Sequence, residues 1–280
     1  MSIEISPPLP TLNANMGAGF SANRIVAAQV AGLMQPVMGM DHFLMSDVTF
    51  APHPHAGFSA VSYVFENSPG ALRNRDSLGN DFEMGPGGLI WTQAARGVVH
   101  DERPAQVGTA VHGVQVFVNL SAKNKGVTPR VFRLEGSDVP VWRDEHGDRV
   151  RVVVGQYGGM KSPVVPVEPF NLFDIKLERK IDLELEAGWN TVLYVLTGEV
   201  EILAEDTTSR VAAGQAIALR GEGTAALTAI SPAHVLLLAG LVFDEPVVSY
   251  GPFIMNTEAQ VQEAVHRFQQ GGMGRLEPLP

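Results

Sequence analysis

The feature that most constrains this chain is the way glycine and proline divide it into short β-type runs. Its 29 glycines and 19 prolines are spread along the sequence, and helical periodicity is scarce before the C-terminal end. Short runs rich in Val, Phe, Tyr, Thr and Leu between turn residues are typical of a β-sandwich or barrel. We therefore expect an all-β fold. The clearest runs are residues 58–65, 89–92, 111–119, 149–155, 170–177, 191–196, 200–203 and 235–241.

One helix is predicted, at Glu258–Gln269. Thr257 can cap its first turn, and Gln260 stands at the capping-box position three residues later. Apolar residues recur on one helical face, at Val261, Ala264, Val265 and Phe268. The helix should pack through that face on the body of the protein.

A weak internal repeat suggests two domains. Tyr63 lies 24 residues before Gly87, and Tyr194 lies 20 residues before Gly214, with a strand, a turn and a further strand in each interval. Two unrelated β-meanders could also look this similar. Proline and charged residues interrupt the apolar pattern between residues 129 and 169. We expect an N-terminal domain at 1–130 and a C-terminal domain at 131–280.

Charge and cysteine content exclude several classes of protein. The net charge of −10 argues against a nonspecific grip on nucleic acid or anionic lipid. The absence of cysteine excludes disulfides, thiolate metal sites and iron–sulfur clusters. The first residues lack the basic end and apolar run of a signal peptide, and no apolar stretch approaches the roughly 20 residues of a membrane span. We expect a cytoplasmic protein with no membrane contact.

Two short patterns could hold a metal through histidine and carboxylate. In a strand, residues i and i+2 face the same side, about 6.5–7 Å apart, so His53 and His55 could converge on one ion. His100 and Glu102 repeat this spacing, with Asp101 directed the other way. The alternative is that both pairs are ordinary polar loop residues.

The chain between the two pairs makes their meeting plausible. His55 and His100 lie 45 positions apart, and four expected strands between them let the chain go out and return beside its start. Three imidazoles and one carboxylate suit Fe(II), Mn, Ni, Cu or Zn and leave coordination positions open. No histidine occurs between His146 and His234, so the second repeat cannot carry such a pair and we expect one metal site of this kind.

Several motifs in order resemble the pirin family, over residues 15–268. They are HPHAGF at 53–58, RDSLGN at 75–80, GPG at 85–87, ARGVVHDE at 95–102, HGVQVFVNL at 112–120 and GPFIMNT at 251–257. The resemblance implies two cupin (jelly-roll) β-barrels with Fe(II) in the first. The ligands would be the residues that match the family's own, His53, His55, His100 and Glu102. Another divalent transition metal could replace the iron.

The polar surroundings of these ligands are thinner than the family pattern. Pro52 stands for an acidic residue, Ala56 for a basic one, and Ser59-Ala60 for Glu-Thr. Polar groups behind the ligands orient them and tune the metal. His42 replaces a usual proline and could line the pocket, and Gln115 could point into the barrel near the metal. Strand parity also places three aromatic residues near the pocket, Phe43, Phe58 and Trp91.

The resemblance implies two functions. The first is a quercetin 2,3-dioxygenase-type oxygenase that uses Fe(II) and O2 on a flavonol-like aromatic substrate, with Glu102 as the residue that accepts the hydroxyl proton. The second is a redox-responsive, non-catalytic regulator that binds transcription factors or metabolic enzymes, in which case the acidic charge favours protein partners over DNA. A cupin that acts on an unrelated small molecule is a third reading.

Overall fold

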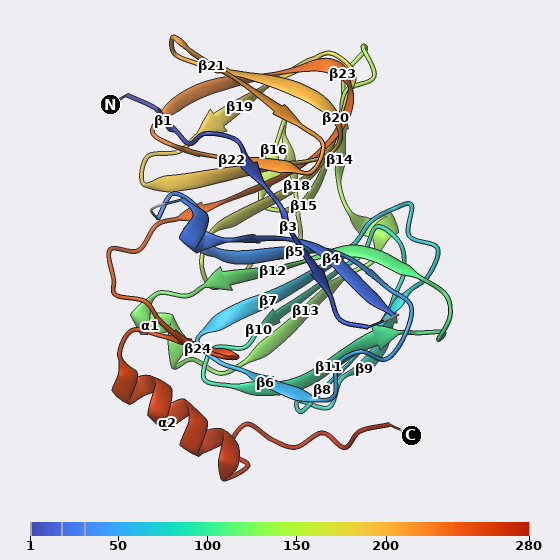
Figure 1. Cartoon of the computed structure of the whole chain (residues 1–280), viewed down its shortest axis with the longest axis vertical. Coiled ribbons are helices and arrows are strands. Elements are labelled where there is room, and N and C mark those ends of the chain that lie inside the picture. The colour runs from blue at the N-terminus through green and yellow to red at the C-terminus, as the bar shows by residue number, and fades with distance from the viewer. Residues whose placement is uncertain (1, 18, 31, 280) are drawn as a thin grey trace. The chain divides into compact units, whose positions relative to one another are not determined.

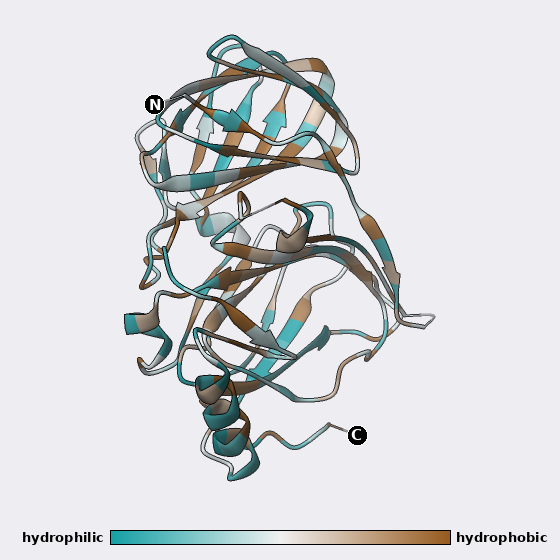
Figure 2. Cartoon of the chain, turned by 60° about the vertical axis from the view of Figure 1, so that its left-hand side comes forward, coloured by the Kyte–Doolittle hydropathy of each residue, from teal (hydrophilic) through white to brown (hydrophobic). Residues whose placement is uncertain are grey.

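The computed structural model describes residues 2–17, 19–30 and 32–279, and these confirm an all-β fold with a C-terminal helix. The chain forms two compact units, each built from three segments. We call the unit of residues 13–24, 39–138 and 243–280 the first barrel, and the unit of residues 1–12, 25–38 and 139–242 the second barrel. Figure 2 shows apolar and polar residues alternating along many strands of both.

Two sheets form the walls of the first barrel (Figure 1). The seven-stranded sheet has the order β13 (Arg130–Leu134), β10 (Leu89–Gln93), β7 (Phe58–Val64), β12 (Val111–Asn119), β5 (Val37–Met45), β4 (Phe20–Val26) and β3 (Leu12–Asn15). The four-stranded sheet has the order β6 (His53–His55), β11 (Val98–Pro104), β8 (Leu72–Asp76) and β9 (Asp81–Met84). Apolar side chains from both sheets, such as Phe43, Leu72 and Ile90, pack into one core.

The second barrel is built on one ten-stranded sheet in the described residues. Its main path is β1 (Glu4–Ile5), β22 (Gln215–Arg220), β20 (Trp189–Ala204), β23 (Gly223–Leu241), β18 (Phe170–Leu177), β15 (Arg149–Val154) and β14 (Val141–Arg143). Off this path lie β2 (Leu9–Pro10), β19 (Lys180–Leu185) and β21 (Thr207–Ala212). A separate hairpin joins β16 (Gln156–Tyr157) and β17 (Met160–Lys161).

The two strands expected at 191–196 and 200–203 are one long strand, β20. Its pairing with β23 shifts register between Val195 and Thr197 and again between Thr197 and Glu199. Gly198 lies between these irregularities with a φ of 81°, a conformation that glycine adopts readily. Bulges let the strand bend without ending, so one strand contributes to both sides of a closed core.

The predicted helix is confirmed as α2 (Glu258–Gln269). The Thr257 side chain accepts a hydrogen bond from the Gln260 amide, and the Gln260 side chain returns to the Thr257 amide. Val261 and Ala264 are buried, whereas Phe268 at the end of the expected apolar face is 37% exposed. The only other regular α-helix in the described chain is the single turn α1 (Ala122–Lys125). Two short 3-10 turns cover Ala27–Gln29 and Gly136–Asp138.

The division into units differs from the expected one at residue 130. The longest segment of the second barrel begins at Val139. Residues 1–12 also belong to the second barrel, and residues 243–280 belong to the first. The N-terminal strands β1 and β2 pair with β22. Near the C-terminus, the hairpin of β24 (Val248–Tyr250) and β25 (Phe253–Met255) reaches the first barrel, where Phe253 bridges to Ala56. None of the helices seen in the described residues has the length and apolar character needed to traverse a lipid bilayer.

Candidate metal centre

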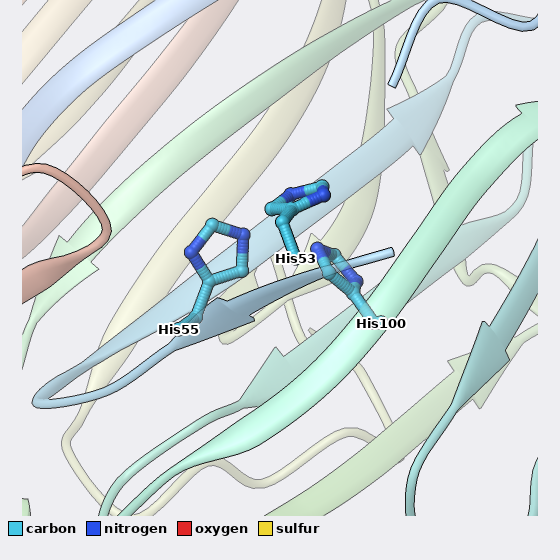
Figure 3. Close-up of side chains that lie close together, drawn as sticks. All are labelled: His53, His55 and His100. Carbon is cyan, nitrogen blue, oxygen red and sulfur yellow. The ribbon is translucent and has the colours of Figure 1, made fainter. Parts of the chain in front are cut away.

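The three histidines of the sequence prediction meet on two neighbouring strands. β6 and β11 run antiparallel, with His53 opposite His100 and His55 opposite Val98. The ring centroids of His53, His55 and His100 lie 4.7–4.8 Å apart, and one ligand nitrogen from each lies within 4.8 Å of the others. Figure 3 shows the imidazoles turned toward one another. The cluster can hold a metal ion.

The hydrogen bonding of these rings also fits a metal. Both ring nitrogens of His55 and of His100 are buried and have no hydrogen-bond partner in the described protein. Leaving a buried polar atom unpaired costs about 1–3 kcal/mol, and a metal bound through one nitrogen of each ring would satisfy two of these four atoms. His53 donates from Nδ1 to the Ala51 carbonyl, 2.9 Å away. That bond fixes the tautomer and leaves the Nε2 lone pair for a metal.

Burial keeps these imidazoles neutral. It lowers the pKa of His100 to about 3 and brings the pKa of His55 well below its ordinary value, with repulsion among the three rings as a further cause. Burial also lowers the pKa of His53, although its hydrogen bond to Ala51 opposes the shift. A metal binds the neutral imidazole, so the cluster needs no deprotonation to accept one near neutral pH.

Glu102 faces the same cavity but lies outside the three-histidine cluster. Its Oε2 accepts hydrogen bonds from Ser62 Oγ at 2.7 Å and Gln115 Nε2 at 2.9 Å. Burial raises the pKa of Glu102 to about 7, against the two hydrogen bonds that lower it. The carboxyl can therefore take up or release a proton near neutral pH. Gln115 points into the barrel as expected, while Ser62 was not anticipated from the sequence.

The cavity has a volume of about 230 Å³ and an apolar lining. Its aromatic side chains are Phe20, Phe43, Phe50 and Phe117, from four segments of the first barrel. Of the three expected aromatics only Phe43 lines it. Phe58 packs on the His55 ring instead, with centroids 5.0 Å apart. Ile90 pairs with Ser62, whose side chain faces the cavity. Trp91, the next residue, therefore faces the other side of the sheet.

One edge of the cavity carries an ion pair. Arg24 donates from Nε and Nη2 to the two carboxylate oxygens of Asp41, at 2.6 and 2.7 Å. Both residues line the cavity, and the Asp41 side chain is 13% exposed. A bidentate pair fixes both planar groups, so this edge offers a rigid polar contact beside the phenylalanines.

Behind the cavity, a buried ion pair holds the strand that carries His100 and Glu102. Asp101 points away from the cavity, as expected, and Arg75 of β8 donates to both of its oxygens. The same guanidinium donates to the Glu277 carbonyl at 3.1 Å. Both partners are at least nine-tenths buried, so removing either would leave an unpaired charge inside the protein.

The bend after His55 depends on a glycine and a buried lysine. Gly57 has a φ of 86°, and a Cβ there would lie 1.9 Å from the Ile254 carbonyl oxygen. Lys125 donates from Nζ to the carbonyls of Gly57 and Ile254, at 2.7 and 3.0 Å, and to Asn119 Oδ1 at 2.6 Å. Lys125 lies at the end of a polar turn, and the sequence around it does not indicate this role.

One other histidine differs from its prediction, because His42 does not line the cavity. It lies beside His112, with 2.7 Å between their Nε2 atoms. His234 of the second barrel lies in strand β23, and its Nε2 is 2.6 Å from the Asp174 carboxylate. In the described part of the second barrel, no three His, Asp or Glu side chains cluster as His53, His55 and His100 do.

Two β-barrels, with a histidine cluster facing the interior of one, define a two-domain cupin protein. Comparison with profiles of known protein families gives the same result and names the family. A profile described as Pirin matches residues 20–118, and one described as the Pirin C-terminal cupin domain matches residues 172–274. The chain belongs to the pirin family.

Named relatives span nearly the whole chain. Pirin from Rattus norvegicus is 33% identical over 264 residues, which cover 92% of this chain and 89% of that protein. A pirin-like protein from Solanum lycopersicum is 32% identical, with 93% and 89% covered. A crystal structure of quercetin 2,3-dioxygenase from Acinetobacter baumannii superposes with a TM-score of 0.86 at 28% identity, covering 99% of this chain and all of that one.

A more distant structure supports the fold. The bacterial pirin YhhW from Escherichia coli, in complex with nickel(II), has a TM-score of 0.64 at 18% identity, over 86% of this chain and 100% of that one.

Proposed function

We propose that this protein is a metal-dependent dioxygenase of the quercetin 2,3-dioxygenase type. His53, His55 and His100 would hold Fe(II), with Glu102 as the fourth ligand. The observation that carries the proposal is the set of four buried, unpartnered nitrogens on His55 and His100, beside a cavity walled by phenylalanines. The resemblance to the Acinetobacter baumannii enzyme supports the substrate class.

The donor set suits this chemistry. Neutral imidazole nitrogens with one carboxylate oxygen suit Fe(II), Mn, Ni, Cu or Zn, and the choice of iron rests on the resemblance to the pirin family. The two hydrogen bonds to Glu102 end on Oε2. Oε1 is then the oxygen through which Glu102 would reach a metal. When bound, the metal would supply Lewis acidity and one-electron chemistry with O2.

The protein's own residues would bind and deprotonate the substrate. A flat aromatic molecule would lie against Phe43 and Phe117, with the Arg24–Asp41 pair as a polar contact at the edge. Glu102 would accept the flavonol hydroxyl proton, because its carboxyl faces the cavity that the substrate would occupy. Ser62 and Gln115 would keep that carboxyl in place while its proton moves.

The test is oxygen consumption by the Fe(II)-loaded protein with quercetin. We expect turnover well above the same concentration of free iron, and a loss of at least about 100-fold in Glu102→Ala, the scale of a general base. Glu145→Ala is the matched control, because the Glu145 side chain is 87% exposed in the second barrel. Turnover equal to free iron, or equal in wild type and Glu102→Ala, would refute the proposal.

If the protein shows no turnover, the alternative to test is a redox-responsive, non-catalytic regulator that binds other proteins. In that case, partners captured by ferrous, ferric and metal-free protein should differ. Identical partners in all three states would exclude a switch controlled by iron.

A further inference from the structure

We infer that His42 and His112 form a second metal site, separate from the three-histidine cluster, which takes a divalent ion such as Ni(II), Cu(II) or Zn(II). The two residues come from neighbouring strands, β5 and β12, of the seven-stranded sheet. Asp41 and Gln115 of these strands line the phenylalanine-walled cavity. His42 and His112 differ from them by odd numbers of positions, so strand alternation turns both to the opposite face of the sheet.

The two imidazoles present their Nε2 atoms to each other, 2.7 Å apart. His112 Nδ1 lies 3.0 Å from Asn67 Oδ1, and an amide oxygen only accepts hydrogen bonds, so Nδ1 carries the proton. The neutral His112 ring therefore has its lone pair on Nε2, directed at His42. A metal-ligating histidine usually has such a partner on its other nitrogen, which orients the ring and fixes the tautomer.

The spacing is close to what a shared metal requires. Two nitrogens bound at about 2.0–2.1 Å stand about 2.9 Å apart when their bonds meet at a right angle, and about 3.3 Å apart at the tetrahedral angle. The observed 2.7 Å would have to widen by only about 0.2–0.6 Å, within reach of small side-chain rotations. Metal binding would replace the hydrogen bond between the two rings, and the proton that His42 carries on Nε2 would move to its Nδ1.

The surroundings can complete the coordination shell. Both rings line a cavity of about 280 Å³ with Asn13, Asn15 and Asn23. Amide oxygens and water can fill the remaining positions around an ion held by two imidazoles. Phe65 packs against both rings, with centroids 5.6 Å from His42 and 4.9 Å from His112, and so limits their other orientations. Imidazole ligands favour Cu, Ni and Zn over Mg or Ca.

The alternative is that the two rings only hydrogen-bond to each other. Calorimetric titration with Ni²⁺ separates the two possibilities. We expect His42→Ala and His112→Ala each to lose one Ni²⁺ per chain relative to wild type. The same loss should follow when His42→Ala is added to a His100→Ala chain. His146→Ala, which removes an exposed histidine from the second barrel, should change nothing.

Two further measurements keep the inference testable if one variant folds poorly. Asn67→Ala leaves both ligands in place and should weaken this site about 10–100-fold, the usual effect of losing the group behind a ligand. Cu(II) on the His100→Ala chain should show electron paramagnetic resonance coupling to two nitrogens. Nickel binding that is the same with and without His42, in chains with native circular dichroism, would overturn the inference. Because these comparisons do not require a working three-histidine cluster, failure of the proposed dioxygenase would be seen separately.

Discussion

The two barrels share the strand register around one tyrosine and one glycine of the repeat, and they differ in the inward side chains beside them. Tyr63 of β7 pairs with Leu89, and Tyr194 of β20 pairs with Ala216, in each case two residues after the glycine of the repeat. The Gly87 amide donates to the Val64 carbonyl at 2.8 Å, and the Gly214 amide donates to the Val195 carbonyl at the same distance. The weak repeat in the sequence is therefore a true repeat of strand register.

The residue before each tyrosine shows what changed. In the first barrel Ser62 lies opposite Gln115, and both hold Glu102. In the second barrel the matching pair is Leu193 opposite Leu237, and both are buried in an apolar core. Register and glycine turns maintain the barrel in both units, so the chemistry of the interior can change without loss of the fold.

The largest expected effect comes from removing a ligand. His100→Ala should abolish stoichiometric binding of iron at the three-histidine cluster, a larger loss than the 10–100-fold that follows when a group behind a ligand is removed. Elemental analysis after gel filtration measures this. An exposed histidine of the other barrel provides the control, since His146→Ala should leave the iron content unchanged. Full iron content in His100→Ala would show that the three-histidine cluster of the first barrel does not hold the iron.

A cavity created by substitution in the core of the second barrel should lower stability and leave iron binding unchanged. Leu237→Ala removes a side chain from a packed core and should lower the free energy of unfolding by about 2–5 kcal/mol. Iron content per folded chain should not change. Denaturant melts monitored by circular dichroism measure the first quantity and elemental analysis the second. A loss of iron with the fold intact would show that the two interiors are not independent.

A single exchange can give the first barrel the side chain of the second. Gln115→Leu should remove one hydrogen bond from Glu102 and lower turnover or metal affinity about 10–100-fold. Stability should fall little, because Gln115 is not fully buried and leucine fills a similar volume. Gln115→Glu would keep the size without the amide donor. Unchanged activity in both variants would contradict the assigned role of the pair.

The smallest effect should come from the helix, which belongs to the first barrel alone. Thr257→Ala removes the cap of α2 and should cost about 1 kcal/mol of unfolding free energy. Thr257→Ser retains a hydroxyl and should cost much less. Hydrogen exchange read by mass spectrometry should place the loss of protection in the first barrel. Equal loss in both barrels would contradict this assignment.

Local signals predicted most of the fold and the three histidines. The i, i+2 spacing was sufficient for His53, His55 and His100, because strand alternation depends only on the backbone. Capping chemistry located the start of α2 for a similar reason, and its length followed from the apolar residues on one face. Ser62 and the aromatics Phe20, Phe50 and Phe117 were missed, because they reach the site through pairings distant in sequence. The role of Lys125 was missed for the same reason, since two of its partners are carbonyls at Gly57 and Ile254.

The contact between Gly57 and Ile254 bears on the order of events during synthesis. Ribosomes make the chain from the N-terminus, so the residues of β6 emerge long before β25. The first barrel is therefore completed after the second, since Lys125 lacks one of its acceptors until Ile254 has emerged. We expect a nascent chain stopped at Val242 to hold a protease-resistant second barrel beside a protease-sensitive first one. Equal resistance of both would show that the C-terminal segment joins a barrel that is already closed.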